Sequence, residues 1–121
     1  MEVHRELGNG FVEPVYHEAL KVEFDRQGIE YVHEAPIQIY YKETPLSCVY
    51  RADFLCFGSV IVELKALREV GKNEHAQVIN YLNAAKLDRG LLINFGATSL
   101  EYGDSSSQNT NLRDLRNLRF T

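Results

Sequence analysis

Residues 50–65 read YRADFLCFGSVIVELK, and this stretch decides the fold. Two runs of β-branched and aromatic residues flank Gly58 and Ser59, which predicts a hairpin of two strands. Because side chains alternate along a strand, Glu63 and Lys65 share one face of the second strand. On the first strand, the alternation gives one face to Arg51, Asp53, Leu55 and Phe57 and the other to Ala52, Phe54 and Cys56.

The length of the loop sets the register of this hairpin. If the loop takes the three residues 57–59, Cys56 faces Val60 and Asp53 lies directly opposite Glu63. A loop of two residues would offset the two carboxylates by one position. Like charges opposite one another destabilise a sheet, so we expect a positive group between them.

Two explanations of these carboxylates are open at this point. Mg²⁺ prefers oxygen ligands and typically takes one or two protein carboxylates, which Asp53 and Glu63 would provide. Alternatively, Asp53 pairs with Arg51 or Lys65 in a surface salt bridge, an arrangement that is common and contributes little to stability.

The whole chain has the length and composition of one globular domain. It has 121 residues, of which 45% are hydrophobic and 25% charged, so it can bury a core. The formal net charge of -4 argues against a tight DNA binder, because such proteins are basic on at least one face. It leaves open an enzyme that reaches phosphates through a bound cation and a few local basic residues.

No membrane segment is expected. The longest apolar run is far too short to cross a bilayer, and residues 1–5 lack the apolar core of a signal peptide. We therefore expect a cytoplasmic protein. Cys48 and Cys56 are expected to be reduced core residues without zinc, since neither a CxxC spacing nor a histidine cluster accompanies them.

Helical and extended patterns alternate along the rest of the chain. The elements expected are a helix from Glu13 to a Gly28 cap, a strand at 37–41, a polar break at 42–45, a helix from about Glu74 to Lys86 capped by Asn73, and a buried strand at 91–95. The order of strand, helix and strand predicts a right-handed parallel crossover. Together with the hairpin it predicts an α/β fold, a three-layer sandwich with a mixed central sheet flanked by helices.

These residues resemble the PD-(D/E)xK nuclease superfamily. Asp53 stands at its first acidic position, and 63–65, Glu-Leu-Lys, stand as its ExK element on the next strand. Residues 10–16, GFVEPVY, fit the GxxExxY signature of one compact branch, and the segments 77–81 and 90–95 follow in the order of that branch. The joint order is more specific than any one motif.

The resemblance implies a restriction-endonuclease-like fold and covers roughly residues 2–96. On this basis we expect residues 1–102 to form a PD-(D/E)xK nuclease-like domain. Residues 103–121 would be a polar loop and a basic C-terminal tail of the same domain, and the resemblance carries nothing across to them.

The resemblance also implies a metal-dependent site for phosphodiester cleavage. Asp53 and Glu63 would hold Mg²⁺ or Mn²⁺, the backbone carbonyl of Leu64 would add a ligand, and Glu13 would face the same cation. Lys65 would position or activate water, which makes Asp53, Glu63 and Lys65 the catalytic set. For Glu13, stabilisation of the helix dipole is an alternative explanation.

Four further residues are expected to support the site or touch substrate: Tyr16, Arg51, Gln77 and Tyr81. Gln77 and Tyr81 resemble the QxxxY element of the RecB-type branch and lie on one helix face, though they could simply satisfy a polar seam. Tyr16 could hydrogen-bond Glu13 or bury its ring, and we favour packing. Arg51 could bind phosphate or hold a carboxylate in place.

The resulting hypothesis is a nuclease that acts on DNA or RNA with Mg²⁺ or Mn²⁺. An alternative is a non-catalytic module that keeps the fold and binds nucleic acid or protein, since function depends on sites rather than folds. A nuclease that cuts both strands commonly needs two sites, and a homodimer or a larger protein complex would supply them.

Overall fold

The computed structural model describes residues 2–96 and 101–104. The helices are α1 (Glu2–Leu7), α2 (Glu13–Gln27) and α3 (Lys72–Ala85). The strands are β1 (Tyr31–Tyr41), β2 (Thr44–Cys56), β3 (Val60–Lys65), β4 (Arg89–Asn94) and β5 (Glu101–Asp104). Of the expected polar loop and basic tail, 103–121, Gly103 and Asp104 belong to β5, so the prediction of a loop at these two residues is wrong, and residues 105–121 lie outside the described residues.

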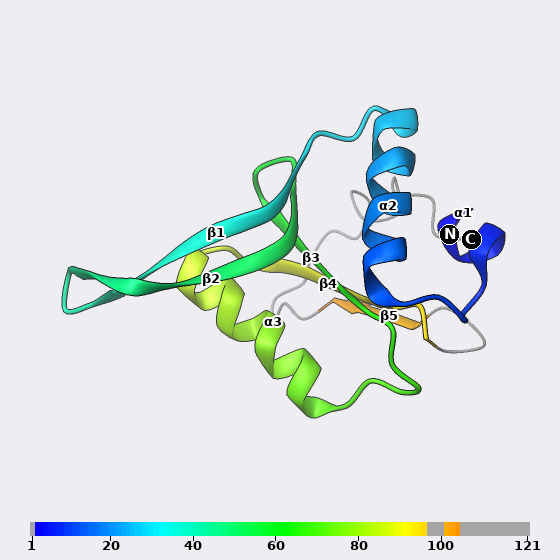
Figure 1. Ribbon diagram of the computed structural model, residues 1–121. Helices are drawn as coiled ribbons and strands as arrows, with labels where there is room; N and C mark the ends of the chain where they lie inside the picture. Colours follow the sequence, from blue (N-terminus) through cyan, green and yellow to red (C-terminus); the bar gives the residue numbers. More distant parts are fainter. Residues whose placement is uncertain (1, 97–100, 105–121) are drawn as a thin grey trace.

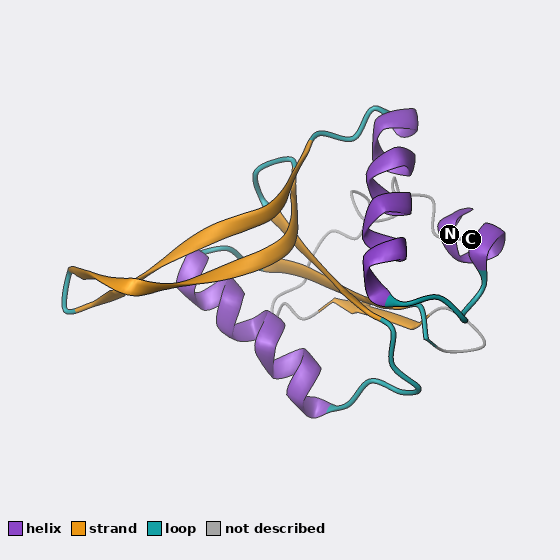
Figure 2. Ribbon diagram, in the orientation of Figure 1, coloured by secondary structure: helices purple, strands orange, loops and turns teal. Residues whose placement is uncertain are grey.

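The strands form one sheet in the order β1-β2-β3-β4-β5. β3 and β4 are parallel, while the other neighbouring strands are antiparallel. α3 connects the parallel pair, as the order of strand, helix and strand predicts. The mixed sheet with its helices, coloured by type in Figure 2, is the restriction-endonuclease-like α/β fold expected from the sequence.

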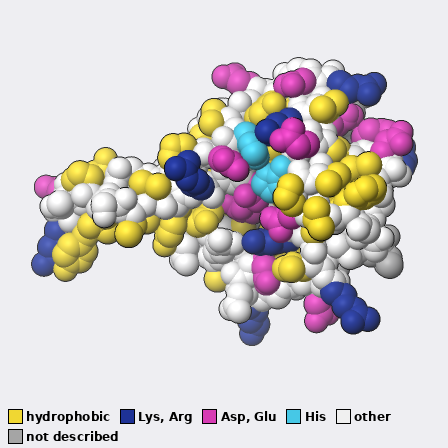
Figure 3. Space-filling view, viewed as in Figure 1, with side chains coloured by type: hydrophobic (Ala, Val, Ile, Leu, Met, Phe, Trp, Pro, Cys, Tyr) yellow, Lys and Arg dark blue, Asp and Glu magenta, His cyan; other side chains and the backbone are white. Residues whose placement is uncertain are grey.

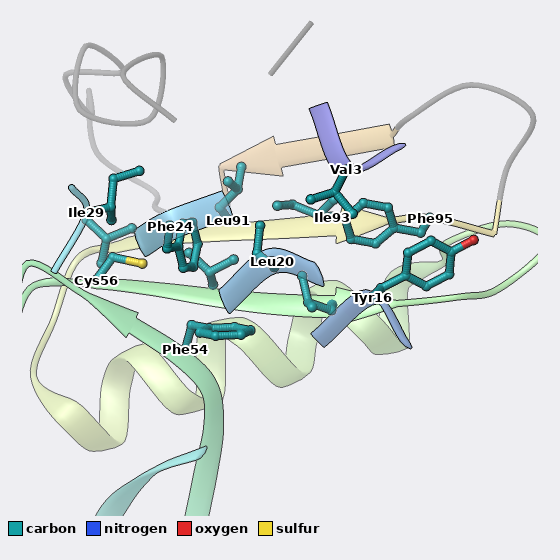
Figure 4. Close-up of a cluster of buried hydrophobic side chains, with 13 residues drawn as sticks. Val3, Tyr16, Leu20, Phe24, Ile29, Phe54, Cys56, Leu91, Ile93 and Phe95 are labelled. Carbon is teal, nitrogen blue, oxygen red and sulfur yellow. The ribbon is translucent and has the colours of Figure 1, made fainter. Parts of the chain in front are cut away.

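Two hydrophobic clusters lie on the two faces of this sheet and make three layers. The first contains the buried stripe of α2, Tyr16, Leu20 and Phe24, packed on Phe54 and Phe95 (Figure 4). The second contains the buried residues of α3, Val78 and Leu82, packed against the opposite face of the sheet (Figure 1). Because β3 alternates between the two clusters, its Val62 and Leu64 face α2 while Ile61 faces α3.

Both long helices begin and end at residues whose backbone explains the boundary. α2 has proline in its first turn and ends at Gly28, whose φ of 70° is the left-handed cap that the sequence predicts. α3 starts at Lys72 rather than Glu74, so the expected cap at Asn73 is wrong. The Glu74 carboxylate accepts a hydrogen bond from the Gly71 N–H at 2.9 Å, and this contact fixes the earlier start.

The β1–β2 hairpin is longer than the sequence predicts. Thr44 pairs with Tyr41, and the expected polar break is only a two-residue turn in which Lys42 and Glu43 have φ of 48° and 68°, the left-handed backbone of a tight hairpin turn. Residues 38–49 project from the body of the molecule in Figure 1, and we call this segment the arm.

β2 bends at Asp53. Pairing with β1 runs through His33↔Phe54 and resumes in the same register at Ala35↔Ala52, and Glu34 between them has a φ of 54°, a left-handed backbone that interrupts the regular strand. Ala52 therefore belongs to the cluster on the α3 side and Phe54 to the cluster on the α2 side. The prediction that these two residues share a face is wrong, because strict alternation assumes a regular strand.

Cys48 and Cys56 differ in their surroundings. Cys56 is buried, and burial raises the pKa of its thiol to about 12. Cys48 is exposed on the arm, so its predicted place in the core is wrong. Within the described residues, no helix combines the length and the apolar character that a bilayer crossing requires.

Asn94 holds the loop that follows β3. Its buried Oδ1 accepts hydrogen bonds from the N–H groups of Leu67 at 2.9 Å and Gly96 at 3.1 Å. At Gly96 an added Cβ would overlap the backbone of Leu67, so the two segments touch main chain to main chain. This clamp fixes the end of β3, where Lys65 lies.

We therefore expect Asn94→Ala to lower the free energy of unfolding by about 2–4 kcal/mol, because two partly buried N–H groups lose their acceptor. Urea unfolding followed by circular dichroism measures the change. Asn83→Ala, on the exposed face of α3, is the control and should stay within about 0.5 kcal/mol of the parent. Equal losses in the two variants would contradict the clamp.

Candidate active site

The candidate site lies where β2 separates from β3. The two strands pair from Cys56↔Val60 to Phe54↔Val62, which is the register of the three-residue loop. Beyond this point the Leu64 N–H donates to Asp53 Oδ2 at 2.7 Å, and the Asp53 N–H donates to Glu63 Oε1 at 3.3 Å. Each carboxylate thus satisfies a backbone donor on the opposing strand, which keeps the two acids next to each other.

Glu63 is almost fully buried, with 3% of its surface exposed. Burial, together with the hydrogen bonding and negative charge of Asp53, raises the pKa of Glu63 to about 9. Near neutral pH the side chain therefore holds a proton when no cation is bound. A cation that binds here has to displace that proton, because carboxylate ligands bind metals in their ionised form.

Lys65 shares the α3 face of β3 with Glu63, as the alternation predicts. Its side chain lines an open pocket of about 390 Å³ between β3, β2 and α3. The positive charge of Lys65 acts to lower the pKa of Glu63, although the burial effect is larger. The amine is therefore close enough to influence charge at the acidic pair.

A second group of side chains reaches Asp53 from α2. Glu13, His17 and Asp53 each offer one ligand atom, and these atoms lie within 4.8 Å of one another. His17 Nε2 is 3.8 Å from Glu13 Oε1 and 3.9 Å from Asp53 Oδ2. Histidine side chains lie beside acidic ones on the face shown in Figure 3. Two oxygen donors and one nitrogen donor at this separation fit a divalent cation such as Mn²⁺.

The sequence analysis did not identify His17. Its other ring nitrogen, Nδ1, lies 3.0 Å from Nε2 of His33 on β1, and its ring packs on Phe54. Burial, the charge of Lys21 and the charge of His17 lower the pKa of His33. The one available signal was that His17 follows Glu13 by four positions, which places both on one helix face. The partner His33 is brought in by packing of the helix against the strand, which no local spacing reveals.

Tyr16 joins the start of α2 to the core. Its ring is buried and stacks on Phe95, with centroids 4.5 Å apart. Its hydroxyl donates to the Gly8 carbonyl at 2.6 Å and accepts from the Phe11 N–H at 3.2 Å. The hydroxyl is thus used within the loop before α2 rather than by Glu13, and this anchoring positions Glu13 at the helix start.

Gln77 and Tyr81 lie on the face of α3 that borders the pocket. Gln77 Nε2 donates to the Tyr81 hydroxyl at 3.1 Å, and the Tyr81 ring stacks on Tyr50 of β2 with centroids 4.7 Å apart. Burial and the negative charge of Glu63 raise the pKa of Tyr81, so its phenol stays protonated. Tyr50 is a second aromatic residue that the sequence analysis did not assign to the site.

Comparison with protein families identifies the superfamily of this chain. A family model described as PD-(D/E)XK nuclease superfamily matches residues 1–104. The chain belongs to the PD-(D/E)XK nuclease superfamily. Its placement in the GxxExxY branch stays a prediction. No match was found among curated proteins.

One solved structure, titled "Crystal structure of SSO0001", has the same fold. The alignment has a TM-score of 0.61 at 15% sequence identity and covers 88% of this chain and 54% of the other. The chain therefore spans about half the length of that structure. At this identity the likeness concerns the fold alone.

The remaining site predictions from the superfamily resemblance concern Leu64 and Arg51. The Leu64 amide donates to Asp53, and a role of its carbonyl as a metal ligand stays a prediction. Arg51 is exposed and pairs with Pro36 across the hairpin, two residues before Asp53. This position leaves both phosphate binding and support of a carboxylate as predictions for Arg51.

Proposed function

We propose that this protein is a nuclease that hydrolyses phosphodiester bonds of nucleic acid with a bound Mg²⁺ or Mn²⁺ ion. The observation that carries the proposal is the meeting of Asp53, Glu63 and Lys65 at the separation of β2 from β3. Membership of a nuclease superfamily supports the same chemistry.

The residues that would hold the cation are Asp53, Glu63 and Glu13, with His17 as a nitrogen ligand. When bound, the cation would supply charge neutralisation at the scissile phosphate and a lowered pKa of water. Asp53 would keep its orientation through the Leu64 N–H while it binds. His33 would hold the His17 ring through Nδ1, since ligating histidines usually engage their second nitrogen in this way.

Lys65 would act on the substrate side of the acidic pair. Its ammonium group would stabilise negative charge that develops on the phosphate oxygens in the transition state. Its place at the edge of the pocket supports this role, because a phosphate between the pocket and Glu63 would lie beside the amine. A homodimer or protein complex stays a prediction.

The test is cleavage of labelled DNA and RNA, single- and double-stranded, by the purified protein with Mn²⁺ or Mg²⁺. We expect Glu63→Ala and Lys65→Ala each to lower the rate by about 100-fold or more. Lys42→Ala, at the tip of the arm, is the matched control and should retain the parent rate. Equal residual activity in the site variants would identify a contaminant. A folded parent without Mn²⁺ binding would favour a non-catalytic module instead.

A further inference from the structure

We propose that the pocket between α3, β2 and the end of β3 binds one unpaired nucleobase, which stacks on Tyr50, and that the substrate is therefore a single strand or a frayed end. This inference deepens the proposed nuclease function and rests on it. It assigns a role to Tyr50, which lies outside the acidic and basic residues of the cleavage site.

The pocket has the size and composition of a site for one nucleotide. Its volume is about 390 Å³, at the lower end of the range of small-ligand pockets. The residues that would contact a nucleotide are Tyr50, Lys65, Asn73, Gln77, Asn80 and Tyr81. Two aromatic rings, three amides and one amine are the groups that recognise a base and its phosphate.

The two tyrosines form a fixed aromatic surface. Tyr50 and Tyr81 stack with centroids 4.7 Å apart and an angle of 29° between the ring planes. The Gln77 side chain donates a hydrogen bond to the Tyr81 hydroxyl at 3.1 Å, so the Tyr81 ring is oriented before any ligand binds. Both tyrosines are partly exposed and line the pocket, and a base can extend the stack.

The polar groups around this surface suit a nucleotide. Amide side chains donate to and accept from base edges, and Asn73, Gln77 and Asn80 border the pocket from successive turns of α3. Glu74 also lines the pocket, and its carboxylate accepts from the Gly71 N–H at the start of the helix. Because this carboxylate already occupies the amino end of α3, a phosphate would lie towards Lys65, the basic residue of the pocket lining.

Lys65 joins the pocket to the cleavage site. It lines the pocket, and it lies two residues after Glu63 on the same face of β3. A nucleotide whose base stacks on Tyr50 would therefore place its phosphate beside Lys65, the residue that the pocket shares with the cleavage site.

An unpaired base fits this arrangement and a base pair does not. A pocket of about 390 Å³ accommodates a single nucleotide, whereas a paired base is stacked inside the duplex and its Watson–Crick edge is hidden from the amides. Stacking on aromatic rings tolerates any base, so the pocket would select unpaired strands without strong sequence preference.

The experiment measures binding of short fluorescein-labelled DNA and RNA by anisotropy, with Ca²⁺ present and strand integrity checked on gels. We expect the parent to bind a single strand about ten-fold or more tightly than the same sequence as a blunt duplex. Tyr50→Leu and Tyr50→Ala should each lose about ten-fold or more of the single-strand affinity. Tyr50→Phe should stay within about two-fold, because it keeps the ring.

Two controls separate stacking from folding. Tyr41→Ala removes a tyrosine that is 63% exposed at the far end of the arm and should bind like the parent. Tyr50→Leu keeps apolar contact with Tyr81, so it reports on the ring even if the alanine variant unfolds. Circular dichroism melts of every variant identify those that fold.

Equal affinity of the parent for single strand and duplex would overturn the inference, as would parent-like affinity of Tyr50→Leu. Mn²⁺ titration calorimetry and cleavage assays on the same preparations tell this failure apart from failure of the nuclease proposal. Metal binding and cleavage without an effect of Tyr50 would sink the pocket assignment alone. A parent that neither binds Mn²⁺ nor cleaves would sink the proposed function.

Discussion

Glu63→Gln is expected to stabilise the metal-free protein by on the order of 3 kcal/mol at about pH 7. The buried carboxyl has its pKa raised to about 9, whereas in the unfolded chain it titrates near the ordinary value of 4.5. Unfolding at neutral pH therefore releases a proton and gains ionisation free energy. Glutamine cannot ionise, and its amide can still accept from the Asp53 N–H while donating to the Asp53 carboxylate, as the protonated acid does.

The pH dependence of the free energy of unfolding tests this prediction. The contribution of Glu63 to stability is fully present below about pH 4.5 and is lost as the pH rises towards about 9. Urea unfolding with a chelator present should thus give similar stabilities for parent and variant near pH 4.5 and an increasing advantage for Glu63→Gln at higher pH. Glu30→Gln, which replaces an exposed glutamate, should show no such divergence. Parallel curves for the parent and Glu63→Gln would be incompatible with a buried protonated acid.

Bound metal should reverse the order of stability of the parent and the Glu63→Gln variant. Saturating Mn²⁺ stabilises the form that binds it, by linkage, so the parent should gain more than Glu63→Gln. Binding by the parent should also release a proton, seen as a dependence of the calorimetric enthalpy on the buffer. Residue 63 would therefore destabilise the empty protein in return for a site that binds a cation.

Asp53→Asn is expected to weaken Mn²⁺ binding by about 100-fold or more. Asp53 lies at the centre of the site, since it contacts Leu64 and Glu63 and lies 3.9 Å from His17. Asparagine keeps an oxygen for the Leu64 N–H but removes the charge, and loss of even an outer partner of a metal ligand commonly costs about 10–100-fold. Isothermal titration with Mn²⁺ and Mg²⁺ measures both affinities.

The same titrations compare two further variants. Asp25→Asn, an exposed acid near the end of α2, should bind like the parent. His17→Gln should lose more affinity for Mn²⁺ than for Mg²⁺, because imidazole suits transition metals and Mg²⁺ prefers oxygen. Parent-like Mn²⁺ affinity in Asp53→Asn would mean that the cation binds elsewhere.

Much of the fold follows from local signals in the sequence. The hairpin around Gly58, the helix ending at Gly28 and the parallel crossover through α3 are all as predicted, because turn chemistry and hydrophobic runs determine them. The full length of the arm was missed, since Lys42 and Glu43 form a tight turn without the usual glycine.

The candidate site was only partly predictable. Asp53, Glu63 and Lys65 come from neighbouring strands, so side-chain alternation and loop length are enough to predict that they meet. His17, His33 and Tyr50 reach the site through packing between elements that are distant in sequence. The irregularity at Asp53, whose carboxylate lies beside both β3 and α2, faces a left-handed Glu34 across the hairpin and has no local signature.

The arm has a further consequence for how such a protein can change over time. In the described residues, neither buried cluster includes a side chain between Gln38 and Val49, so the outer hairpin can vary in length and sequence without loss of the core. Tyr50 lies at the base of that variable part, whereas the acidic residues lie within the packed body. Insertions or exchanges in the hairpin could therefore diversify which ligands are captured while the hydrolytic chemistry stays the same.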